Sequence, residues 1–264
     1  MCLILMAWRA HPDFPLVVAA NRDEYYARPS AAAGFWSDAP GILAGRDLQA
    51  GGTWLGVTRE GRFAALTNFR DPSHVRSDAP SRGILVSEYL RSQSGPEAFL
   101  AGLAAIAPAY NGFNLLAADA RSAACYSNRE DRPRRLGAGI YGLSNHLLDT
   151  PWPKVARAKS ALARALDTLP ERERFFDLLL DRAPVPDDEL PRTGVSMEWE
   201  RLLSAAFVHS ASYGTRSSTV VVLDKAGHLD FEERAFDEEG RTGEARRFTL
   251  RVPYPTQPVG AGEA

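Results

Sequence analysis

The stretch VVAANRDEYY, residues 17–26, places three consecutive charged side chains directly after an apolar run. Residues 15–20, PLVVAA, have the composition of a buried strand, and Asn21, Arg22, Asp23 and Glu24 follow it. Charges at the end of a buried strand are costly unless they are paired or solvated. Residues 3–8, LILMAW, form a second apolar run, and the turn-forming RAHPD between the runs predicts a hairpin. This hairpin would bring the start of the chain beside Asn-Arg-Asp-Glu.

Composition and charge bound the class of protein. The chain has 264 residues, of which 45% are hydrophobic and 24% charged, and its net charge is -2. These values are typical of a soluble globular protein with one sizeable core. A net charge this small provides no global basic field that would hold nucleic acid or an anionic membrane. We therefore expect neither kind of partner.

The lack of recognisable targeting signals and the low cysteine content favour a cytoplasmic location. The N-terminal residues lack the basic region of a signal peptide, and no segment is long enough to cross a membrane. Two cysteines, Cys2 and Cys125, do not make a disulfide framework, which fits a reducing compartment. The predicted localisation is cytoplasmic.

Apolar runs separated by turn residues predict the strands. They cover residues 3–8, 15–20, 53–58, 62–68, 113–119, 122–128 and 139–145, with a long hairpin over 215–236 whose tip is 225–227. Residues 28–52 and 183–194 are rich in turn formers and predict loops.

Helical spacing and capping signals predict four helices. They cover residues 81–93 with Ser81 as N-cap, 95–107 with Pro96 in the first turn, 151–169 with Thr150 as N-cap, and 171–182. The order of strands, then helices, then strands predicts an α+β layered sandwich with antiparallel sheets. We expect one domain over residues 1–252 and a disordered tail over 253–264.

Cys2 carries the chemistry that the sequence suggests. A small second residue normally allows removal of the initiator methionine, which leaves a cysteine with a free α-amine beside its thiol. Reference pKa values of about 7.7–8.0 for the amine and about 8.5 for the thiol lie close together. The amine can therefore act as the local base for the thiol, as in N-terminal nucleophile (Ntn) hydrolases. The alternative is a small buried hydrophobe at the start of a strand.

Nearly the whole chain resembles the NRDE family, the family of transport and Golgi organisation protein homologues. The segments that carry the resemblance are MCLIL (1–5), NRDEYYARP (21–29), GGTWLG (51–56), ALTNFR (65–70), SRGILVSEYL (81–90), YNGFNLL (110–116), YGLSNHLLDTPWPKV (141–155) and SSTVVVLD (217–224). The resemblance implies a link to secretory-pathway organisation, lipid metabolism or haem handling. It does not imply a defined activity.

The same segments more distantly resemble cysteine Ntn hydrolases of the penicillin V acylase and bile-salt hydrolase type. That resemblance implies an αββα four-layer sandwich with two stacked antiparallel sheets. It also implies that Cys2 is the nucleophile and that Asp23 holds its amine. Those enzymes carry an arginine where this chain has Ala20, and Arg22 is the candidate replacement.

The remaining catalytic candidates follow from the same resemblance. Asn68, in Thr-Asn-Phe, matches an oxyanion-hole asparagine, and Asn145 matches the asparagine of a Leu-Thr-Asn stretch, with Asp149 and Trp152 beyond it. Arg216, before SSTVVVL, is the loosest match, to an arginine near the nucleophile. Uncharged amides suit this task because they donate hydrogen bonds without titrating.

Four further residues are candidate supporting or substrate-binding groups. We expect Arg22 and Glu24 to form an ion pair or to contact the substrate within the site. The alternative is a salt bridge on the surface. Asn21 is expected to support them. Trp54 either lines a pocket or packs between sheets, and packing is favoured.

Two functions from different classes remain open. The first is an amidohydrolase in which Cys2 attacks a linear amide or thioester, a C–N hydrolase in the amide case. The second is a carrier or trafficking protein that binds an acyl chain, acyl-CoA, lipid or haem in an Ntn-like pocket without turnover. We expect no metal, because the five histidines lack ligand spacing, and no cofactor, because GAGIYG (137–142) opens no helix. The sequence does not determine the oligomeric state.

Overall fold

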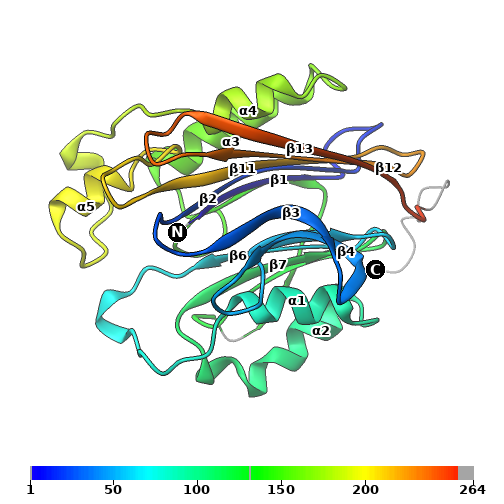
Figure 1. Ribbon diagram of the computed structural model, residues 1–264, viewed down its shortest axis with the longest axis horizontal. Coiled ribbons are helices and arrows are strands. Elements are labelled where there is room, and N and C mark those ends of the chain that lie inside the picture. Colours follow the sequence, from blue (N-terminus) through cyan, green and yellow to red (C-terminus); the bar gives the residue numbers. More distant parts are fainter. Residues whose placement is uncertain (1, 131, 255–264) are drawn as a thin grey trace.

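Two antiparallel sheets are stacked face to face, with helices covering their outer faces (Figure 1). The computed structural model describes residues 2–130 and 132–254. Helices α3 and α4 pack on the first sheet, and α1 and α2 pack on the second. The predicted αββα four-layer sandwich is confirmed.

The first sheet has the strand order β10-β1-β2-β11-β12-β13. Its strands are β1 (Cys2–Trp8), β2 (Leu16–Tyr25), β10 (Gly139–Leu143), β11 (Tyr213–Leu223), β12 (His228–Phe236) and β13 (Thr242–Arg251). The second sheet has the order β3-β4-β5-β6-β7-β8-β9. Its strands are β3 (Ser30–Trp36), β4 (Ala39–Asp47), β5 (Leu55–Thr58), β6 (Phe63–Asn68), β7 (Phe113–Ala118), β8 (Ala123–Ser127) and β9 (Arg134–Arg135).

The helices are short. The α-helices are α1 (Gly83–Arg91), α2 (Pro96–Gly102), α3 (Pro153–Leu166), α4 (Glu173–Leu179) and α5 (Met197–Leu202), and four 3-10 turns lie at Pro72–His74, Leu103–Ala105, Ala107–Ala109 and Asp187–Glu189. No helix within the described residues is long and apolar enough to cross a membrane.

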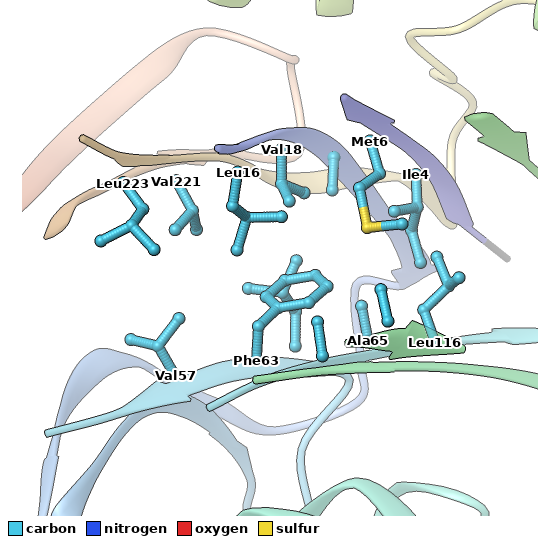
Figure 2. Close-up of a cluster of buried hydrophobic side chains, with 14 of the residues drawn as sticks. Ile4, Met6, Leu16, Val18, Val57, Phe63, Ala65, Leu116, Val221 and Leu223 are labelled. Carbon is cyan, nitrogen blue, oxygen red and sulfur yellow. The ribbon is translucent and has the colours of Figure 1, made fainter. Parts of the chain in front are cut away.

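Alternation along the strands divides the core into layers. Ile4 and Met6 point between the sheets toward Phe63 and Ala65 of β6 (Figure 2). Leu3 and Leu5, one residue out of phase, pack instead with α3 and α4. A third cluster lies between the second sheet and α1 and α2. β1 and β2 are buried on both faces, and because successive side chains of a strand point to opposite faces, each strand contributes to two layers of the core.

Several boundary predictions were wrong for identifiable reasons. The predicted loop over residues 28–52 contains β3 and β4, whose pairing shifts register twice and so leaves no regular alternation. The prediction missed β13, which is mostly exposed and charged, and also α5. Ser81 and Thr150 are not N-caps, because Arg82 and Trp152 occupy those positions without side-chain capping bonds.

β2 is longer than the sequence predicted. β2 extends through Asn-Arg-Asp-Glu to Tyr25, because β11 pairs with it as far as Tyr213. The four polar residues therefore lie within a strand rather than after it. Of the predicted disordered tail, residues 255–264 lie outside the described residues.

Candidate active site

A cavity of about 470 Å³ lies where β1 begins and where β2 and β6 end. Cys2, Arg22, Asp23 and Glu24 line it from the first sheet, and Asn68 lines it from the second. The remaining wall comes from the loop before β5 and from the segment that leads into α1. With Trp54 from the loop before β5, the structure thus gathers six of the residues singled out in the sequence around one polar space.

Cys2 lines this cavity from the start of β1. Its register partner across the ladder is Arg22, so both side chains leave the same face of the sheet. Burial raises the pKa of the Cys2 thiol, while the Arg22 charge and a hydrogen bond from the backbone amide of Asp23 oppose that rise. Cys2 nevertheless keeps partial exposure toward the cavity. A thiol in this position is protonated at neutral pH unless a base removes its proton.

Asp23 is a buried carboxyl group that lines the same cavity and interacts electrostatically with the Cys2 thiol. Thr215 donates a 2.8 Å hydrogen bond to its Oδ1, and Tyr213 donates one of 3.1 Å to its carbonyl oxygen. The ladder between β2 and β11 shifts register at Arg216, and this bulge sets Thr215 opposite Asp23. Burial raises the pKa of the Asp23 carboxyl, whereas the Lys154 charge and the Thr215 bond lower it.

A buried charge network that the sequence analysis missed lies behind Asp23. Lys154 of α3 is 3% exposed and donates to the carbonyl of Leu203 at 2.7 Å. Burial lowers its pKa to about 8. Arg70 and Glu200 form a buried ion pair of 2.8 Å whose charges also act on Lys154. A signal existed in the sequence, because Lys154 falls on the helix face that carries the buried residues of α3.

A hydrogen bond joins the two predicted asparagines. Asn145 is fully buried, and its amide donates a 2.9 Å hydrogen bond to the carbonyl of Asn68. The Ser144 hydroxyl lies 3.2 Å from the Cys2 carbonyl oxygen and 3.3 Å from Asn145 Oδ1. These contacts join the start of β1 to the ends of β6 and β10. Asn68 lines the cavity directly, and Asn145 is connected to the cavity through its hydrogen bond to Asn68.

Arg22 and Trp54 form a stacked pair inside the cavity. The Arg22 guanidinium lies 4.2 Å from the centre of the Trp54 ring, and Arg22 is only 5% exposed. Its Nη2 is 4.0 Å from Glu24 Oε2, so this ion pair belongs to the site and is not a surface salt bridge. Its Nη1 is buried and has no hydrogen-bond partner among the described residues. Trp54 both packs against the inter-sheet core and lines the cavity.

Two predicted residues lie apart from the cavity. The Asn21 amide donates to the carbonyls of Leu179 and Ala206, both at 2.8 Å, and its Oδ1 accepts a bond from Ser218. Asn21 therefore ties β2 to the helical layer. Arg216 donates to the carbonyls of Tyr25, Tyr26 and Arg28 and so supports the turn after β2. Arg22 and Arg82, which line the cavity, are the described arginines that interact electrostatically with the Cys2 thiol.

Asp149 and Trp152 lie outside the cavity lining as well. Asp149 accepts a bond from the backbone amide of Gly142, which fixes the end of β10. Trp152 precedes α3, and the Arg70 guanidinium carbon lies 4.9 Å from the centre of the Trp152 ring. Both residues thus support the elements that carry the site.

Glycines allow the outer wall to approach the site. Gly51 has a φ of +77°, which a side chain would strain, and a Cβ on Gly52 would lie 2.4 Å from the carbonyl carbon of Gly83. The start of α1 is therefore pressed against the loop before β5. This contact places Arg82 in the lining, where its Nη1 donates to the carbonyl of Gly112 at 3.0 Å.

Cys125 lies away from the site, in the core between the sheets. Burial raises its pKa to about 12, so its thiol stays protonated at neutral pH. This environment suits a structural cysteine.

Comparison with known proteins identifies relatives along most of the chain. The family described as Transport and Golgi organisation 2 matches residues 1–238. The Transport and Golgi organization protein 2 homolog of Bos taurus is 38% identical over 259 residues, which cover 89% of this chain and 93% of that protein. The Homo sapiens homolog is 36% identical over 276 residues, which cover 95% and 100%.

Two solved structures are more distantly similar. One is a Caenorhabditis elegans ortholog of N-acylethanolamine-hydrolyzing acid amidase, with a TM-score of 0.48, 11% identity, and coverage of 84% of this chain and 92% of that one. The other is a C2A mutant of conjugated bile acid hydrolase from Clostridium perfringens, with a TM-score of 0.48, 10% identity, and coverage of 98% and 100%.

Proposed function

This chain belongs to the Transport and Golgi organisation 2 family, and we propose that it is an N-terminal-cysteine amidohydrolase acting on a linear amide or thioester. One observation carries the proposal. The second residue of the chain is a cysteine that lines a polar cavity together with a buried carboxyl group, Asp23, whose charge interacts with its thiol. Removal of Met1 would give that cysteine its own base, and Asp23 would hold the ammonium form of the base.

The proposed reaction has two halves. In the first, the α-amine of Cys2 takes the thiol proton while Sγ attacks the substrate carbonyl carbon. The resulting tetrahedral oxyanion collapses, and the C–N or C–S bond breaks. The leaving group takes the proton from the α-ammonium, and an acyl-thioester remains on Cys2. In the second half, water attacks this thioester, gives a proton to the α-amine, and releases the acid with regeneration of the thiol.

We propose that Asn68, at the end of β6 in the second sheet, stabilises the oxyanion. Asn68 lines the cavity on the side facing Cys2, and its amide is the proposed donor to the developing charge. Asn145 is proposed to position Asn68 through the 2.9 Å bond to its carbonyl. We assign Arg216 a supporting role in the turn after β2 rather than a direct one.

The carrier alternative requires a different lining. An acyl chain or lipid needs an extended apolar surface, whereas three arginines and three carboxylates line this cavity. Haem needs an axial ligand from a residue such as His, Met, Tyr or Cys. Among the described residues of the cavity lining, Cys2 alone belongs to these types. We therefore favour the hydrolase. The unpaired thiols fit a reducing compartment, and we propose a cytoplasmic location.

The test is a hydrolysis screen with a matched inactive variant. Short acyl-amides and acyl-thioesters are incubated with wild-type protein and with Cys2→Ser, and product acid is measured. Serine is nearly isosteric but far less nucleophilic at neutral pH, so turnover should disappear while the fold is kept. Cys125→Ser is the control and should retain turnover. Equal turnover by wild type and Cys2→Ser, or tight binding of a hydrophobic ligand without any turnover, would overturn the proposal.

A further inference from the structure

The charges that line the cavity do not balance once their contacts are assigned. Arg28 is paired with Asp47 at 2.6 Å. Asp23 faces Lys154 and, in the proposed processed chain, the α-amine of Cys2. Among the carboxylates of the lining, Glu24 then remains for both Arg22 and Arg82, and it also lies 3.9 Å from Arg28. Glu233, outside the lining, also interacts with Arg22, but burial raises the pKa of its carboxyl group. With these contacts assigned, the cavity lining has one more arginine than it has carboxylates to pair.

Arg22 is held in place but is not fully hydrogen-bonded. Stacking on Trp54 fixes the plane of the guanidinium, and Glu24 is at the limit of ion-pair distance from Nη2. Nη1 is buried without a hydrogen-bond partner among the described residues. A buried charged donor left unpaired is costly, so such a group commonly marks the place of a ligand atom.

We propose that Arg22, assisted by Arg82, binds a carboxylate carried by the acyl part of the substrate. The substrate class is then a short monoamide or monothioester of a dicarboxylic acid. This inference rests on the proposed function of the same site, because it assumes that the scissile carbonyl is at Cys2.

The spacing of the two strands sets the length of that acyl group. Cys2 and Arg22 are register partners, and such side chains begin about 4.5–5.5 Å apart. Because both side chains also line the same cavity, a short acyl chain can join a carboxylate on Arg22 to a carbonyl at the Cys2 sulfur. The planar arginine fork suits a carboxylate, because two parallel N–H bonds can meet its two oxygens.

A pair of alkylating reagents tests this subsite without any need for turnover. Iodoacetate and iodoacetamide are nearly isosteric, and only iodoacetate carries the carboxylate. Labelling of Cys2 by each reagent is followed by peptide mass spectrometry, with N-acetylcysteine as the reference thiol at the same pH. The ratio of iodoacetate to iodoacetamide rates at Cys2 should exceed the reference ratio by about tenfold or more, the effect of one charge-assisted hydrogen bond.

Variants of Arg22 test whether this residue causes the preference for iodoacetate. Arg22→Gln should return the ratio to the reference value, and Arg22→Lys should keep part of it because the charge remains. Any effect of Arg22 on thiol acidity changes both rates together and cancels in the ratio. Arg164→Gln removes an exposed arginine of α3 outside the cavity lining and should leave the ratio unchanged.

A measurement on the wild-type protein tests the anion subsite even if the Arg22 variants do not fold. Succinamate should protect Cys2 from iodoacetamide, and neutral succinamide should protect it much less. A wild-type ratio equal to that of the reference thiol, equal protection by the two amides, or a ratio that survives in folded Arg22→Gln would each overturn the anion subsite.

Failure of the subsite and failure of the hydrolase give different results. If the ratio is raised and succinamate is not hydrolysed, the anion subsite stands and the proposed chemistry falls. If neutral amides are hydrolysed by Cys2 while the ratio is not raised, the chemistry stands and the substrate class is wrong.

Discussion

Cys2 and Arg22 are directly opposed in the ladder between β1 and β2, so the thiol and the guanidinium share one face of the first sheet. Strand alternation then divides Asn-Arg-Asp-Glu between two environments. Arg22 and Glu24 face the cavity between the sheets, and Arg22 stacks there on Trp54. Asn21 turns toward the helical layer. One short polar run thus serves both the site and the packing behind it.

Asp23→Asn should remove the group that holds the α-amine of processed Cys2. The amide is nearly isosteric but neutral, so the ammonium form of the base loses its partner, and kcat should fall by about 10²-fold or more. Steady-state kinetics on an amide that the wild type hydrolyses checks this. Asp47→Asn is the matched control, since Asp47 lines the same cavity but pairs with Arg28, and its effect on kcat should be much smaller. Equal losses in the two variants would contradict the role of Asp23.

Asn68→Ala should lower kcat by about 10²- to 10³-fold with little change in KM, because an oxyanion donor acts mainly in the transition state. Asn145→Ala should lower kcat through Asn68, whose carbonyl it holds. The double variant distinguishes the two roles, because residues that act through one another are not additive. If the two losses in kcat multiply in the double variant, Asn145 acts independently of Asn68.

Lys154→Met should change how stability depends on pH. The pKa of Lys154 is about 8 in the folded protein, against an ordinary 10.5. Between these pH values the unfolded chain binds a proton that the folded chain has lost, so this group makes the free energy of unfolding rise with pH. Urea unfolding at pH 7.5 and pH 10 should therefore show wild type gaining stability relative to Lys154→Met as pH rises. A difference between the proteins that is the same at both pH values would rule out the buried, weakly basic lysine.

Asn21→Ala should act on stability rather than on substrate binding. The change leaves the buried carbonyls of Leu179 and Ala206 without their donor, which should cost about 2–4 kcal/mol of unfolding free energy. Ser218→Ala removes only the bond that Asn21 accepts and should cost about 1 kcal/mol. Urea unfolding of both variants measures the difference. A cost for Asn21→Ala no larger than that for Ser218→Ala would show that the two carbonyl bonds contribute little.

Local pattern predicted the strands that are continuous apolar runs bounded by turn residues. β1, β6, β7 and the hairpin of β11 and β12 follow from apolar runs and turn residues, because each has a buried face. β3 and β13 could not be predicted in this way. β3 is rich in alanine and pairs irregularly, and β13 exposes most of its side chains.

The site was predictable where residues are close in sequence or carry a recognised motif. Cys2, Asp23 and Asn68 line the cavity that the sequence led us to expect, although their catalytic roles remain predictions. Arg82 was missed because a tertiary contact, the close approach of Gly52 to Gly83, brings it to the cavity. Lys154 lies on the buried face of α3, and its position in the helical pattern was the signal that the sequence analysis overlooked. The distant partners of Arg216 in the turn after β2 were hidden for the same reason.

The intact mass of the protein, acid-quenched during reaction with an activated acyl-thioester, tests the central claim most directly. The account predicts a chain that lacks Met1 and carries one acyl group, located on Cys2 by peptide sequencing, and no such adduct in Cys2→Ser. A chain that keeps Met1, or a processed chain that never gains an acyl group while the thioester is consumed, would contradict it.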